Sequence, residues 1–114
     1  MSQITTHILD TSRGKPAQGV PVILYRQHDN DSYWDIIAAN TTDKDGRIKE
    51  FADQNGQLTP GVYKLKFETS QYFERHTTSS FYPCIEVMFN VSKGEHYHIP
   101  LLLSPFGYST YRGS

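Results

Sequence analysis

The 114-residue chain carries 11 Lys and Arg against 12 Asp and Glu, a formal net charge of −1 with histidine neutral. Hydrophobic residues make up 37% and charged residues 20%, which predicts one modest core and excludes a disordered tail. The near-neutral charge, with no basic block, argues against nucleic acid as a partner. We expect residues 1–114 to form a single domain.

The first half of the chain is predicted to form strands separated by turns. An aromatic content of 13%, with 8 Gly and 6 Pro, favours β structure interrupted by turns. Alternating apolar and polar residues predict strands over 4–10, 20–27, 33–41 and 47–51. The segment 13–16 separates the first two strands. The dipeptide Asp45-Gly46 accepts a positive φ and places Arg47 at the start of the fourth strand.

The second half continues this pattern and adds one short helix. Further strands are predicted over 62–68, 85–91, 96–103 and 106–111, with turns at Asn55-Gly56 and Pro60-Gly61. Ser70 is expected to cap a helix over 71–76, which needs tertiary packing to be stable. Eight short strands and one helix predict an all-β sandwich.

Two histidines and one arginine are candidates for chemistry. His7 shares a predicted strand face with Thr5, and His98 shares one with His96, the face that turns outward if residues 99, 101 and 103 point into the core. Each imidazole titrates near neutral pH and suits a pocket or an interface, although a lone histidine is more often structural. Arg47 is either an ordinary edge charge or a fixed planar donor for a carbonyl-rich ligand.

Other chemical signals in the sequence are weak. His96 and His98 lie two residues apart, but no third ligand completes a metal site, so we do not expect a metal. Nucleotide-binding and hydrolase motifs are absent, so any catalysis must use water activated by side chains. Cys84 is the single cysteine, which favours a reducing compartment such as the cytoplasm. No signal-peptide pattern or membrane-spanning apolar stretch is seen, so no membrane partner is expected.

The last seven residues keep a strand-like pattern almost to the end of the chain. Most chain termini fray, but the segment 108–114 is rich in Tyr, Arg and hydroxyl groups and ends in its own carboxylate. Such a tail is either frayed or held inside a site or an interface.

Two long stretches at opposite ends of the chain resemble the transthyretin family. The first reads His7-Ile8-Leu9-Asp10, then Gly14-Lys15-Pro16-Ala17, then Val20-Pro21-Val22, and the second is the segment 97–110, YHIPLLLSPFGYST. The resemblance covers essentially the whole chain. It implies a sandwich of two four-stranded sheets, a homotetramer, and sites in clefts where subunits meet along a central channel.

Within that family, a few positions distinguish enzymes of purine metabolism from hormone carriers. The two histidines, the arginine and the terminal Tyr-Arg-Gly-Ser resemble the enzymes that hydrolyse 5-hydroxyisourate to 2-oxo-4-hydroxy-4-carboxy-5-ureidoimidazoline in urate degradation. The resemblance implies catalysis without a cofactor, with either histidine as the base. The implied catalytic residues are His7, Arg47, His98 and Ser114, and the implied substrate-binding residues are His7, Arg47, Tyr111 and Arg112.

Two readings without catalysis stay open. The first is a transthyretin-like protein that binds a small ligand such as a thyroid hormone, and the second is a structural sandwich that mediates protein contacts. The combination of His7, Arg47 and His98 argues against the carrier, because an apolar iodinated ring has no use for two histidines and an arginine. A polar tail argues against a purely structural domain.

Overall fold

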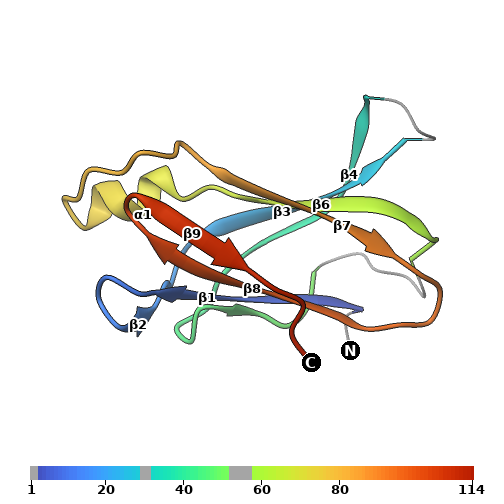
Figure 1. Cartoon of the computed structure of the whole chain (residues 1–114), viewed down its shortest axis with the longest axis horizontal. Coiled ribbons are helices and arrows are strands. Elements are labelled where there is room, and N and C mark those ends of the chain that lie inside the picture. The colour runs from blue at the N-terminus through green and yellow to red at the C-terminus, as the bar shows by residue number, and fades with distance from the viewer. Residues whose placement is uncertain (1–2, 29–31, 52–57) are drawn as a thin grey trace.

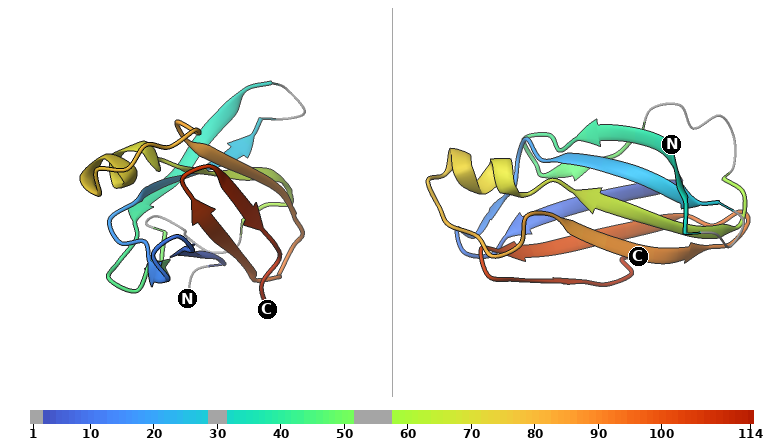
Figure 2. Two further views of the ribbon diagram at one scale, coloured as in Figure 1. Left: turned by 60° about the vertical axis from the view of Figure 1, so that its left-hand side comes forward. Right: turned by 90° about the horizontal axis from the view of Figure 1, so that it is seen from above.

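The computed structural model describes residues 3–28, 32–51 and 58–114, which form two layers of strands with one short helix at the end of the sandwich (Figures 1 and 2). The predicted turn at Asn55-Gly56 lies outside the described residues. In chain order the elements are β1 (Ile4–Asp10), β2 (Lys15–Pro16), β3 (Pro21–Gln27), β4 (Trp34–Thr41), β5 (Arg47–Ile48), β6 (Gly61–Phe67), α1 (Ser70–Arg75), β7 (Ile85–Val91), β8 (Tyr97–Ser104) and β9 (Gly107–Thr110).

The two sheets are each built on a path of four strands. One has the order β2-β1-β8-β9 and the other β4-β3-β6-β7, and the short strand β5 also pairs with β1. Strands β1 and β8 run parallel, whereas the remaining pairs are antiparallel. β2 and β5 share the other edge of β1, where β5 pairs with residues 6 and 7 and β2 with residues 9 and 10. The predicted sandwich of two sheets is confirmed, with the difference that β5 gives one sheet a fifth strand.

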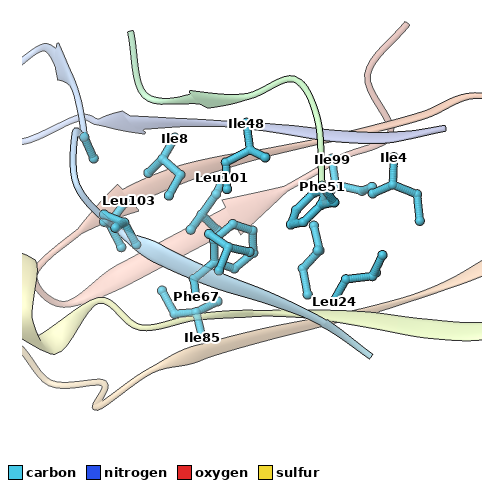
Figure 3. Packing of buried hydrophobic residues seen from close by; sticks show 14 of the residues in the cluster. Ile4, Ile8, Leu24, Ile48, Phe51, Phe67, Ile85, Ile99, Leu101 and Leu103 are labelled. Carbon is cyan, nitrogen blue, oxygen red and sulfur yellow. The ribbon is translucent and has the colours of Figure 1, made fainter. Parts of the chain in front are cut away.

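Alternation along β1 and β8, interrupted only by the buried Pro100, separates a core face from an outer face. Ile4 and Ile8 of β1 and Leu101 and Leu103 of β8 are at most 1% exposed. These side chains point toward the opposite sheet, where residues such as Phe67 complete the core (Figure 3). Each such side chain contributes roughly 1.5–3 kcal/mol when fully buried. Because strand side chains alternate, the outer face is left to the half-buried residues between them, including His7 and His98.

The helix differs from the prediction at its first residue. Ser70 is not the N-cap but the first helical residue, and Thr69 occupies the cap position without a side-chain hydrogen bond. The helix instead depends on burial of Tyr72 and Phe73, as expected for a helix too short to be stable alone. No helix in the described ranges is long and apolar enough to cross a membrane.

Candidate active site

A tight turn places the short strand β5 against β1. One carboxylate oxygen of Asp43 accepts hydrogen bonds from the backbone N–H groups of Asp45 (2.9 Å) and Arg47 (3.0 Å). Gly46 has a φ of +74°, and a Cβ there would lie 2.5 Å from the carbonyl oxygen of Ile8. The carbonyl oxygen of Gly46 in turn accepts a 2.8 Å hydrogen bond from the N–H of Ile8. Only glycine therefore allows this turn to dock on β1, and the docking fixes Arg47 at the strand start.

Strand pairing brings the three predicted polar residues onto one outer face. Arg47 of β5 is the register partner of His7, and on the other side of β1 the partner of Thr5 is His98 of β8. Thr5 and His7 are two residues apart and so share a face. All four side chains are half-buried. Since directly paired side chains lie about 4.5–5.5 Å apart at Cβ, the three strands present Arg47, His7 and His98 as one cluster.

The environment of this cluster favours neutral imidazoles. Burial is the main cause that lowers the pKa of His7 below its ordinary value of 6.5, and the neighbouring Arg47 charge lowers it further. A hydrogen bond to the backbone of Asp45 and the charges of Asp43 and Asp45 oppose this shift. Burial, followed by the charges of Arg47, His7 and His96, also lowers the pKa of His98. Each ring therefore keeps a lone pair available to accept a proton near neutral pH.

The C-terminal tail is ordered against β8. The N–H of Gly113 donates a 2.8 Å hydrogen bond to the carbonyl oxygen of His98, and the two residues form an antiparallel bridge. A Cβ at Gly113 would lie 2.7 Å from Cδ2 of His98 and 3.2 Å from Cγ of Pro100. The tail backbone thus packs directly on the His98 ring. Ser114, the last predicted catalytic residue, directly follows Gly113 in the chain and is exposed.

The two other tail residues predicted to bind substrate lie differently. Arg112 forms a 2.9 Å ion pair with Glu95 and stacks its guanidinium 4.6 Å from the centre of the Tyr97 ring. Tyr111 is 58% exposed, and both residues border a groove of about 370 Å³ next to β7. Within the described residues, no hydrogen bond joins either side chain to His7. One chain therefore brings Arg47 and the two histidines together, but not the side chains of Tyr111 and Arg112.

Sequence analysis did not identify Thr5 and Gly113 as parts of this site. The hydroxyl oxygen of Thr5 lies 2.8 Å from Nδ1 of His98 and 3.3 Å from Nε2 of His96. The sequence placed Thr5 on the face of His7, but only the parallel pairing of β1 with β8 joins it to His98. The one signal for Gly113 was its place in a tail rich in larger side chains. Among the described residues, no group of three or more His, Cys, Asp or Glu side chains is arranged to hold a metal ion.

Comparison with known proteins gives a consistent result along the whole chain. Residues 4–113 match the HIUase/Transthyretin family. A protein of Salmonella dublin named 5-hydroxyisourate hydrolase is 49% identical over 112 residues, which cover 97% of this chain and 80% of that protein.

Two solved structures share the fold. The 5-hydroxyisourate hydrolase of Klebsiella pneumoniae is 39% identical with a TM-score of 0.83, and covers 97% of this chain and 98% of its own. Sea bream transthyretin in complex with thyroxine is 32% identical with a TM-score of 0.89, at 97% and 94% coverage. The chain belongs to the HIUase/Transthyretin family.

Proposed function

We propose that this chain hydrolyses 5-hydroxyisourate to 2-oxo-4-hydroxy-4-carboxy-5-ureidoimidazoline, a step of urate degradation, at the cluster of His7, Arg47 and His98. The observation that carries the proposal is the arrangement of one guanidinium beside two imidazoles whose pKa values are lowered by burial and by that charge. The relatives from Salmonella dublin and Klebsiella pneumoniae, which are named for this reaction, support the same substrate.

The reaction adds water across one amide bond of the six-membered ring. The water oxygen bonds to the ring carbonyl carbon, the carbon–nitrogen bond breaks, and a carboxyl and a ureido group result. One imidazole accepts the proton of the attacking water, and the departing nitrogen takes up a proton. Arg47 holds the attacked oxygen and stabilises its developing negative charge, a contribution worth roughly 10²–10³ in rate. His7 and Arg47 also orient the planar substrate through their ring and guanidinium N–H groups.

The C-terminal tail is proposed to complete the pocket. Tyr111 and Arg112 close it over the substrate, and Ser114 or its carboxylate orients a histidine or the water. The contact of Gly113 with His98 supports this proposal because it holds the tail beside the cluster. The three strands of a single chain offer one wall, so a second copy must supply the opposite wall and exclude water.

We propose a homotetramer as the working form. Strands β7 and β9 are edges of their sheets, with backbone groups able to pair with another copy. Exposed apolar side chains lie on or beside both edges: Met88 is 60% exposed on β7, Tyr108 43% on β9, and Phe106 70% in the turn before β9. Burial of these side chains favours association across both edges. A mass near four times the 13.1 kDa chain in light scattering is expected, and a fully active monomer would contradict the proposal.

A carrier without catalysis is the competing function. Overall fold does not separate the two, because sea bream transthyretin has the higher TM-score and the Klebsiella hydrolase the higher sequence identity. The side chains of the cluster distinguish the hydrolase from the carrier. Two neutral imidazoles and a guanidinium on one face suit a substrate rich in carbonyl and N–H groups, whereas a largely apolar ring gains little from them.

The single cysteine supports a proposal about the compartment. Cys84 is a free thiol in the structure, and a small domain that folds without a disulfide suits a reducing environment. We propose that the protein works in the cytoplasm, and cell fractionation with an antibody against the chain would test this.

The direct test is hydrolysis of 5-hydroxyisourate made in place from urate and urate oxidase. The substrate decays unaided, so the ultraviolet decay is compared with and without the protein. We expect acceleration that depends on protein concentration and is lost in His98→Asn. His28→Asn, a change at an exposed histidine outside the cluster, should retain activity. No acceleration by the folded wild-type protein would reject the hydrolase and favour a screen for bound ligands.

A further inference from the structure

The hydroxyl of Thr5 contacts the Nδ1 nitrogen of the His98 ring. Thr5 Oγ1 lies 2.8 Å from Nδ1 of His98, a distance typical of a hydrogen bond. A second contact, 3.3 Å to Nε2 of His96, is longer and weaker. A hydroxyl has one proton to donate and can accept two, so Thr5 can satisfy Nδ1 whether or not that nitrogen carries a proton.

The position of this hydroxyl is fixed by the fold. Thr5 and His98 are register partners on the parallel strands β1 and β8, so neither backbone can slide without breaking the pairing. Threonine is β-branched and has few rotamers, which limits the movement of its oxygen. On the other side, the backbone of Gly113 packs on the ring, where even a Cβ would meet Cδ2 of His98 at 2.7 Å. The imidazole is therefore held between a hydroxyl and a backbone segment.

The groups around His98 favour one state of the ring. The charged and titratable groups that act on it are Arg47 of β5, His7 of β1 and His96 just before β8. No Asp or Glu side chain is among these described neighbours. The positive charge of Arg47 favours the neutral ring, in which only one nitrogen carries a proton. Nε2 is left bare when Nδ1 carries that proton. The hydroxyl oxygen of Thr5 can accept the proton that then remains on Nδ1.

We propose that Thr5 is a positioning residue that accepts the Nδ1–H of His98 and so leaves the Nε2 lone pair facing the substrate as the general base. This inference rests on the proposed hydrolase function and assigns the base within it. In the reaction, Nε2 takes the proton of the attacking water while Nδ1–H stays bonded to Thr5. In many enzymes a carboxylate orients the base. A neutral hydroxyl instead orients the ring without adding a charge that would favour its protonation.

The experiment compares Thr5→Val with Thr5→Ser. Valine keeps the branched shape and removes the hydroxyl, whereas serine keeps the hydroxyl. We expect kcat to fall about tenfold in Thr5→Val, the equivalent of one hydrogen bond, with little change in KM, and Thr5→Ser to restore most of it. Thr41→Val, a change at an exposed residue of β4 in the other sheet, is the matched control for the loss of a threonine hydroxyl in a strand.

Nitrogen-15 NMR of histidine provides a readout that does not depend on turnover. In the wild-type protein the His98 ring should carry its proton on Nδ1, and in Thr5→Val this preference should be lost. His96→Asn should change kcat and the ring state less than Thr5→Val does, because its contact is longer.

Three results would overturn the proposal. One is a wild-type ring protonated on Nε2, another is an unchanged ring state in Thr5→Val, and the third is an effect of His96→Asn as large as that of Thr5→Val. The proposed function fails separately. If wild-type protein does not hydrolyse the substrate, the base role of His98 is rejected, while a ring state that still depends on Thr5 shows that the positioning contact itself is correct.

Discussion

Strand β1 carries two polar clusters with opposite properties. At its C-terminal end, the Asp10 side chain is 1% exposed and accepts four hydrogen bonds, two from Ser12, one from the Arg13 backbone and one of 2.7 Å from the Tyr72 hydroxyl. Earlier on the strand, His7 is half-buried beside the cation of Arg47. The first cluster has its hydrogen bonds satisfied, whereas the second keeps lone pairs for a ligand.

The pKa values of Asp10, His7 and His98 show the consequence of this difference in hydrogen bonding. Burial opposes ionisation of Asp10, yet hydrogen bonds from Ser12, Tyr72 and the Arg13 backbone outweigh it and lower the pKa. That carboxylate stays charged and fastens α1 to β1. For His7 and His98, burial and the Arg47 charge act together and favour the neutral ring. A satisfied polar group stabilises the fold, while a desolvated ring with a lone pair can accept a proton.

The largest expected effect is on activity in Arg47→Gln. Removal of the guanidinium takes away the group proposed to stabilise the oxyanion, so kcat/KM should fall roughly 10²–10³-fold. The same change should raise the pKa of both His7 and His98 in NMR titrations, because one cause that lowers them is gone. Arg47→Lys keeps the charge and should leave those pKa values low. Unchanged pKa values in Arg47→Gln would contradict the electrostatic coupling of the cluster.

Asp10→Asn should affect stability and leave the chemistry intact. The amide cannot accept all the hydrogen bonds that the buried carboxylate accepts, so the free energy of unfolding should fall by about 1–3 kcal/mol. Urea denaturation followed by fluorescence measures this change. Activity per folded molecule should stay near wild type at low temperature. A loss of kcat without a loss of stability would mean that the two clusters on β1 are not independent.

Gly113→Ala tests how closely the tail holds the His98 ring. The new methyl group would meet Cδ2 of His98 at 2.7 Å, so either the ring or the tail must shift. We expect kcat to fall by about tenfold with a change in Tm of only a few degrees. Gly107→Ala is the matched control, since its Cβ would meet only the Ser104 hydroxyl at 3.7 Å. Equal activity of the two variants would show that the tail contact is not needed for catalysis.

The smallest effect is the dependence of stability on pH in the range just below 6.5. Both rings have a folded-state pKa below the ordinary 6.5, so the unfolded chain binds more protons as the pH falls through this range. Their contribution to stability is therefore present above pH 6.5 and is lost on acidification. Urea titrations across this range should show the slope, and His98→Asn should reduce it. Asp10 titrates below this window.

The sequence by itself determined most of the strands and the orientation of the key residues. Alternation in residues 4–10 and 96–103 predicted that His7 shares a face with Thr5, and that His98 faces outward if residues 99, 101 and 103 point into the core. The structure agrees because a strand places successive side chains on opposite faces. The Asp45-Gly46 turn likewise predicted Arg47 at a strand start. These are local properties, fixed by spacing and by the φ that a glycine allows.

Only the tertiary structure decided which of these residues meet. Thr5 and His98 are 93 positions apart, and they touch because β1 and β8 pair in parallel, a long-range pairing that no local pattern encodes. The same holds for Gly113 against His98 and for Tyr72 on Asp10. Tertiary packing also decided the helix start, since burial of Tyr72 and Phe73 outweighed the capping preference of Ser70. The direction of each polar side chain of the candidate site follows from its own strand, but the contacts among these side chains arise from packing across the sheet.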